Sequence, residues 1–135
     1  MKVTLYTDGA SRGNPGQAGL GVVIYAEDGQ KIAELCEYLG STTNNIAEYK
    51  ALIRGLEEAK VLGATEVEVF TDSELMARQI NGQYKVKNAG LIPLYQKSKE
   101  LLFSFGNAKV NHVRREFNKE ADKLANLAID KHQMS

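Results

Sequence analysis

The sequence predicts an α/β fold in which helices pack on a mixed five-stranded sheet. Three features of the chain lead to this prediction. Strand-forming segments separated by glycine-containing turns fill the first forty residues. Helical spacing of apolar residues then begins near residue 45, and strand-like and helical segments alternate to the end of the chain. Short connections make the first three strands antiparallel, and an intervening helix lets a later strand return parallel to an earlier one.

The first strand is expected at Val3–Thr7, which is rich in strand formers, and Asp8–Gly16 reads as a glycine-rich turn. Gly19–Tyr25 and Lys31–Leu39 read as the next two strands, because Asp28-Gly29 between them is typical of a tight hairpin. These three segments should form one antiparallel meander.

The rest of the chain supplies the helices and the last two strands. Ile46, Tyr49, Ile53 and Leu56 recur at helical spacing, and Gly63 is a natural C-cap for that helix. The expected elements in chain order are a helix over 45–62, a strand at Glu66–Thr71, a helix from Ser73 to about Ile80, a helix over 90–104, a strand at Lys109–Val113 and a helix over 118–132.

Length and composition predict one domain over residues 1–135, because the hydrophobic content of 43% and charged content of 25% are ordinary for a globular chain. No apolar run is long enough to span a membrane, and the N-terminus reads straight into a strand, so neither a membrane segment nor a signal peptide is expected. The single cysteine, Cys36, cannot form an internal disulfide. A monomer in the reducing cytoplasm, without an obligate protein partner, is therefore expected.

The net charge of zero conceals an asymmetry between the two halves of the chain. Residues 1–72 hold 6 Lys+Arg and 11 Asp+Glu, and residues 73–135 hold 11 Lys+Arg and 6 Asp+Glu. A basic half beside an acidic half suits a metal-dependent enzyme that acts on a polyanion. Chance clustering on solvated helices explains the same counts equally well.

Four carboxylates have neighbourhoods that a purely structural role does not require. Asp8 follows the first strand, Glu48 follows the doublet Asn44-Asn45, Asp72 follows the fourth strand and Asp122 lies in the first turns of the last helix. Each has a simpler explanation as a turn residue, a capping box between Asn45 and Glu48, an N-cap at Asp72 or a surface acid.

Considered together, the four carboxylates predict a metal site. If the strand before Asp8 lies beside the strand before Asp72, those two side chains meet at the centre of the sheet. Glu48 and Asp122 then approach from helix starts, and four clustered negative charges require cations. Oxygen ligands alone select Mg²⁺ or Mn²⁺. Two such ions would activate a water and stabilise the leaving oxygen of a phosphodiester.

The polar residues around these acids suit a nucleic-acid backbone. Gly9 and its neighbouring glycines would let a substrate strand approach the main chain closely. Amides can read base edges or a 2′-hydroxyl, and lysines can contact phosphates. The candidate substrate-binding residues are Gly9, Asn14, Asn44, Asn45, Ser73, Lys85 and Lys87.

Four segments of the chain closely resemble a type 1 ribonuclease H. They are Thr7–Gly16, Thr42–Tyr49, Thr71–Ser73 and Asn118–Asp122, and they cover one complete catalytic domain in the family's order. The resemblance implies the ribonuclease H-like fold and an endonuclease that cuts the RNA strand of RNA/DNA hybrids with two Mg²⁺ or Mn²⁺ ions, leaving 3′-hydroxyl and 5′-phosphate ends. It also implies that Asp8, Glu48, Asp72 and Asp122 are the metal-binding catalytic set, with Glu48 next to the RNA 2′-hydroxyl.

The chain departs from well-studied bacterial members in two places. Those members carry a histidine in a glycine-rich loop before the last helix, whereas His112 lies too early and is expected on the fifth strand. The segment resembles archaeal-like members instead, in which the arginine at the position of Arg115 assists turnover or product release. The basic protrusion is also missing, because only the link over 81–88 joins the second and third helices, so substrate affinity should be salt-sensitive.

Two alternatives stay open at this point. A junction-resolving or strand-transferring DNA nuclease of the same fold would carry similar carboxylates. A non-catalytic hybrid-binding module would not benefit from four negative charges that face phosphates. A comparison of hybrid with all-DNA substrate, with and without chelator, separates these alternatives.

Overall fold

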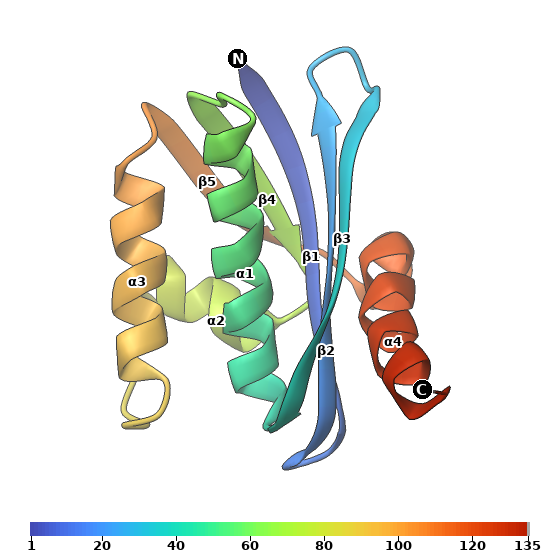
Figure 1. The fold of residues 1–135 in the computed structure, drawn as a ribbon. Helices are drawn as coiled ribbons and strands as arrows, with labels where there is room; N and C mark the ends of the chain where they lie inside the picture. The colour runs from blue at the N-terminus through green and yellow to red at the C-terminus, as the bar shows by residue number, and fades with distance from the viewer. Residues whose placement is uncertain (135) are drawn as a thin grey trace.

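The structure, a computed structural model that describes residues 1–134, has one mixed sheet with helices on both faces (Figure 1). In chain order its elements are β1 Lys2–Gly13, β2 Gly16–Ala26, β3 Lys31–Thr42, α1 Asn44–Val61, β4 Glu66–Thr71, α2 Glu74–Ile80, α3 Ile92–Phe103, β5 Asn107–His112, a 3₁₀ turn Arg115–Phe117 and α4 Lys119–Met134. Within these residues no helix is both long and apolar enough to cross a membrane.

The strand order across the sheet is β3-β2-β1-β4-β5. β2 runs antiparallel to both β1 and β3, while β4 runs parallel to both β1 and β5. This confirms the predicted sheet of three antiparallel and two parallel strands. α1 connects the edge strand β3 to β4, which lies beside β1.

The helices form two unequal layers around the sheet (Figure 1). α1 packs on β1 and β2 and also contacts α3, and their shared core includes the fully buried Leu5, Leu52 and Leu56. α4 packs alone on the opposite face, over β1, β2 and β3. Buried alanines of α4 lie against glycines of β2, which lets this helix approach the sheet backbone closely. The site described below lies at the middle of the sheet, on β1, where α1 approaches from one face and α4 from the other.

The turn expected over Asp8–Gly16 is confined to Asn14 and Pro15. β1 continues through Asp8 to Gly13, and each residue of this extension pairs with β2, as far as Gly13 opposite Gly16. The glycines and polar residues look like a turn in the sequence, but the backbone ladder to β2 keeps them extended. β4 pairs with β1 only as far as Thr71 opposite Thr7. Asp8 is therefore the first residue of β1 beyond the end of its parallel neighbour.

Candidate metal centre

The sheet register brings Asp8 and Asp72 together. Thr7 and Thr71 are register partners in the parallel pair of β1 and β4, so the residue after each occupies a matching position. Beyond this point β4 has ended while β1 continues, which opens a gap in the sheet next to Asp8. The predicted meeting of these two carboxylates at the centre of the sheet is confirmed.

α1 supplies the third carboxylate through a close contact with β1. A Cβ atom built on Gly9 would lie 2.2 Å from the carbonyl carbon of Ala47, so only glycine permits this approach. The Gly9 N–H donates a hydrogen bond of 2.8 Å to Oε1 of Glu48. From the sequence, the glycine at position 9 was expected to let the substrate approach. In the structure, the packing of α1 against β1 explains why this position is glycine.

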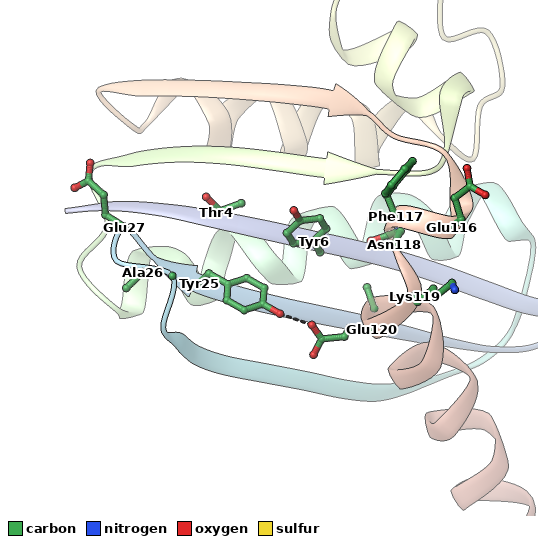
Figure 2. Close-up of a pocket in the computed structure, with 12 residues that line it drawn as sticks. Thr4, Tyr6, Tyr25, Ala26, Glu27, Glu116, Phe117, Asn118, Lys119 and Glu120 are labelled. Atoms are coloured by element: carbon green, nitrogen blue, oxygen red, sulfur yellow. Dashed lines mark hydrogen bonds between the residues drawn. The ribbon is translucent and has the colours of Figure 1, made fainter.

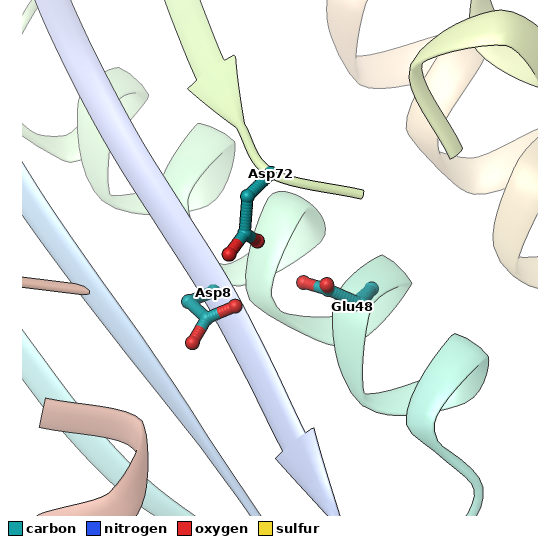
Figure 3. A group of neighbouring side chains, drawn as sticks. All are labelled: Asp8, Glu48 and Asp72. Atoms are coloured by element: carbon teal, nitrogen blue, oxygen red, sulfur yellow. The ribbon is translucent and has the colours of Figure 1, made fainter. Parts of the chain in front are cut away.

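Asp8, Glu48 and Asp72 form one cluster of oxygen ligands (Figure 3). Each offers a carboxylate oxygen, and these three oxygens lie within 4.8 Å of one another. Asp8 and Glu48 are each only 4% exposed. Buried like charges at this separation repel strongly unless protons or cations neutralise them. The ligand set contains only oxygen, which fits a hard divalent cation.

The electrostatics of the cluster favour the protonated acids when no cation is bound. Burial raises the pKa of Asp8, and the carboxylates of Glu48 and Asp72 raise it further. Burial also raises the pKa of Glu48, partly offset by the hydrogen bond from the Gly9 N–H. A dication at this position would replace these protons and remove the repulsion.

Asp122 lies at the same cavity but outside the cluster of three. Its side chain is 31% exposed, and Oδ1 lies 3.9 Å from Nη2 of Arg115. The Asn126 amide, one turn further along α4, donates to the same oxygen at 3.3 Å. A side-chain hydrogen bond with Asp122 raises the pKa of Asp8, and the negative charge of Asp122 raises the pKa of Glu48, so Asp122 contacts the cluster through Asp8.

The simpler explanations offered for Glu48 and Asp72 are wrong. Thr43, not Asn45, caps α1, because Thr43 Oγ1 accepts from the Ile46 N–H. Ser73, not Asp72, caps α2, because Ser73 Oγ accepts from the Met76 N–H at 3.2 Å. Neither the Glu48 nor the Asp72 carboxylate caps a helix, so both are available to bind a cation.

The carboxylates open into a cavity of about 400 Å³. Several predicted residues line it: Asp8, Gly9, Asn44, Glu48, Asp72, Ser73, Arg115 and Asp122. The cavity also includes three residues that the sequence reasoning missed, Ala10, Ser11 and Asn126. Asn126 lies four positions after Asp122 on the same helix. Residues at this spacing share a helix face, so Asn126 could have been predicted as a neighbour of Asp122.

Five of the predicted or considered residues lie outside this lining. Asn14 stands beside it, since its Oδ1 accepts from the Asn44 N–H at 3.2 Å, and Asn45 is exposed on α1. Lys85 and Lys87 are exposed on the link between α2 and α3. His112 ends β5 and lines a different cavity, with Glu74 and Arg78 of α2 among others.

A larger cavity of about 530 Å³ lies on the sheet face beside the start of α4 (Figure 2). Its aromatic residues are Tyr6, Tyr25 and Phe117, and it contains none of the clustered acids. The Tyr25 hydroxyl donates to Glu120 of α4, and Lys31 Nζ also contacts Glu120, at 2.6 Å. These two contacts connect Glu120, in the same turn of α4 as Asp122, to β2 and β3.

The model of the "Reverse transcriptase-like" family matches residues 6–128 of the chain. The chain is 45% identical over 131 residues to the "Bifunctional protein Rv2228c" of Mycobacterium tuberculosis, a match that covers 96% of this chain. It spans only 36% of the length of that relative.

Solved structures match over the whole length of the fold. The crystal structure of RNase H1 from Halobacterium salinarum has a TM-score of 0.95 and 41% identity, and the match covers 97% of this chain and 99% of that one. LC11-RNase H1, solved in complex with an RNA/DNA hybrid, has a TM-score of 0.92 and 46% identity over 97% of this chain and 99% of its own.

Proposed function

Since the chain belongs to the ribonuclease H family, we propose that it hydrolyses the RNA strand of RNA/DNA hybrids at the carboxylate cluster. The observation that carries the proposal is the convergence of three carboxylate oxygens within 4.8 Å, two of them on buried side chains. The complex of LC11-RNase H1 with an RNA/DNA hybrid supports the substrate class.

Asp8, Glu48 and Asp72 would hold the metal, and Asp122 would complete a second metal position from α4. Two Mg²⁺ or Mn²⁺ ions bound there supply the charge that activates a water and stabilises the leaving 3′-oxygen of the RNA. The Gly9 N–H holds the Glu48 carboxylate, and Asp8 is buried on β1, so both side chains would offer their oxygens from constrained positions. The proposed products carry 3′-hydroxyl and 5′-phosphate ends.

The remaining residues would position the hybrid. Gly9, Asn44 and Ser73 line the cavity and offer backbone and polar groups to the RNA strand. Asn14, in the turn after β1, and Asn45, at the start of α1, would extend this polar surface, and Lys85 and Lys87 would contact phosphates from the link before α3. Arg115, 80% exposed at the rim of the cavity, would contact a phosphate near the cleaved bond or assist product release.

The domain over 1–135 is proposed to act as a cytoplasmic monomer, and size-exclusion chromatography with light scattering tests the oligomeric state.

The proposed reaction is tested by incubating an end-labelled RNA/DNA hybrid with Mg²⁺ or Mn²⁺ and separating the products on a gel. RNA duplex and DNA duplex serve as controls, and a chelator removes the metal. We expect cleavage of the RNA strand of the hybrid only, and none with chelator. Preferential cleavage of DNA duplex would favour the DNA nuclease of the same fold.

A further inference from the structure

The junction between β1 and α4 contains a buried amide that belongs to neither the metal cluster nor a helix cap. Asn118, 1% exposed, directly precedes α4 (Figure 2). Its Nδ2 donates a hydrogen bond of 2.9 Å to the main-chain oxygen of Thr7. Thr7 precedes Asp8 on β1, and Asn118 lies one helical turn before Asp122. This one bond therefore links the backbone beside one carboxylate to the helix turn that carries another.

The side chain of Asn118 does not serve the helix start. Its main-chain oxygen accepts from the Asp122 N–H at 3.1 Å, as an N-cap residue does. However, Oδ1, which would cap the helix, is one of two buried side-chain oxygens in residues 1–134 without a hydrogen-bond partner. The other is Thr7 Oγ1 at the same junction. When only the N–H group of a buried amide forms a hydrogen bond and its oxygen forms none, the side chain contributes little net free energy to folding. We therefore look for its role in the position of the backbone that it holds.

We infer that Asn118 is a positioning residue that sets the distance between Asp122 and the cluster of Asp8, Glu48 and Asp72. This inference rests on the proposed metal-dependent cleavage. Asp122 is the one acid that reaches the cavity from the opposite layer of the fold, so its placement depends on how α4 begins. Tyr25 and Lys31 tie the same turn through Glu120 to β2 and β3, whereas the Asn118 bond ties it to β1 next to Asp8. Without that bond the first turn of α4 can shift relative to β1, and a displacement of about 1 Å in such a site costs on the order of 100-fold in rate.

Two variants of Asn118 separate positioning from stability. Asn118→Ala removes the bond, and Asn118→Ser also removes it but restores a side chain that can cap α4. For both we expect kcat to fall about 100-fold with the KM for hybrid within about threefold of wild type. The melting temperature should fall by less than about 5 °C in Asn118→Ala and less still in Asn118→Ser.

Asn81→Ala is the matched control, because Asn81 Nδ2 also donates to a main-chain oxygen between two elements, that of Val110, at 3.0 Å. It lies outside the cavity of the carboxylates. This variant should lose a similar amount of thermal stability and keep kcat within about twofold of wild type.

A second readout does not depend on cleavage. In an NMR titration with Mg²⁺, the amide signals of both Asp8 and Asp122 should shift in wild type. In Asn118→Ala the Asp8 response should persist, while the Asp122 response should need about tenfold more Mg²⁺.

A folded variant with unchanged kcat, or with an unchanged Asp122 response, would overturn the inference. Failure of both variants to fold would also overturn it, since Asn118 would then be a stabilising residue. Absence of cleavage by wild type would instead contradict the proposed function and leave the titration to decide the role of Asn118.

Discussion

Asp8 carries a carboxylate that is 4% exposed and lies within 4.8 Å of two others. Burial removes water that would otherwise stabilise its charge, and the neighbouring carboxylates add repulsion, so its pKa is raised. In the absence of a cation this arrangement destabilises the folded chain. The same arrangement binds a dication well, because the ligands are already assembled.

Asp8→Asn tests both consequences. The amide keeps the shape of the side chain and removes one negative charge, so without Mg²⁺ we expect the variant to be more stable than wild type by at least about 2 kcal/mol at pH 8. Cleavage of hybrid should be abolished, because a metal ligand is lost. Thermal unfolding in the presence of chelator measures the first effect, and the gel assay measures the second.

Asp130→Asn is the control for this substitution. Asp130 is an exposed acid on α4 whose partner is Arg12, at 2.8 Å. Loss of a surface ion pair should change stability by less than about 1 kcal/mol and leave cleavage intact. A lower melting temperature for Asp8→Asn than for wild type would count against a crowded acidic site.

At the scale of elements, the position of α4 depends on the absence of a side chain on β2. Gly21 is the register partner of Asp8, and a Cβ atom built there would lie 2.1 Å from the carbonyl oxygen of Ala121. Ala121 directly precedes Asp122. The close packing of α4 on the sheet therefore occurs beside the metal cluster and, together with the bond from Asn118 to Thr7, holds the turn that carries Asp122.

Gly21→Ala should push the start of α4 away from the sheet. We expect a loss of about 2–4 kcal/mol in the free energy of unfolding, because the added methyl group meets backbone that cannot move aside cheaply. Cleavage by the protein that remains folded should fall about tenfold or more. Chemical denaturation and initial-rate measurements below the melting temperature check these two effects.

Gly106→Ala is the comparison for Gly21→Ala. A Cβ atom at Gly106 would meet only the Thr65 carbonyl oxygen, at the ordinary contact distance of 3.4 Å. This variant should stay within about 1 kcal/mol of wild type and keep its activity. An equally mild effect of Gly21→Ala would show that α4 tolerates displacement from β2.

The elements themselves were largely predictable, because apolar periodicity and connection length determine which segments form strands and helices. The extension of β1 through Asp8–Gly13 was not predictable in this way. Its glycines favour a turn locally, and only pairing with β2 makes them a strand. Likewise, the choice of Thr43 over Asn45 as the α1 cap depends on where the helix begins in three dimensions.

The site was predictable to different degrees at different residues. Asp8 and Asp72 follow strands that a parallel pairing brings together, so their meeting could be inferred from topology. How closely Asp122 approaches the other three could not, because it depends on where α4 packs against the sheet. Asn118 stands at the start of the last helix expected from the sequence, and only the folded structure shows its bond to Thr7.

For the whole molecule, the acidic cluster makes stability depend on pH. The pKa values of Asp8 and Glu48 are raised in the folded chain, so the folded state binds more protons than the unfolded state above about pH 4. Their stabilising contribution is complete below the unfolded pKa values and is lost as pH rises toward the folded ones.

The melting temperature of the metal-free protein should therefore fall as pH rises from about 5 to about 8. Mg²⁺ should raise the melting temperature more at pH 8 than at pH 5, since protons compete with the cation at the lower pH. Scanning calorimetry across this range, with Mg²⁺ and with chelator, measures both trends. A metal-free stability that increases from pH 5 to pH 8 would contradict raised pKa values in the cluster.

The uneven distribution of charge along the chain should appear in the salt dependence of substrate binding. Lys85 and Lys87 are exposed on the link between α2 and α3, in the basic half of the chain. Replacing both with alanine should weaken hybrid binding and reduce the slope of log K against log salt by roughly 1–2. Fluorescence anisotropy with labelled hybrid measures the slope in Ca²⁺ or chelator, where cleavage does not interfere.

Lys2→Ala provides the control, because Lys2 is the first residue of β1 and lies outside the lining of the carboxylate cavity. It should leave both the affinity and the salt slope unchanged. Equal effects of the Lys2 and Lys85/Lys87 substitutions would mean that the link does not contact the hybrid.

The acidic cluster as a cation site is tested most directly by isothermal titration of Mg²⁺ into wild type and Asp8→Asn at pH 7.5, repeated in buffers with different ionisation enthalpies. Because the clustered acids retain protons without metal, Mg²⁺ binding to wild type should release about one proton, and Asp8→Asn should bind at least about tenfold more weakly. Equal Mg²⁺ affinity in the two proteins, or binding without proton release, would contradict the account.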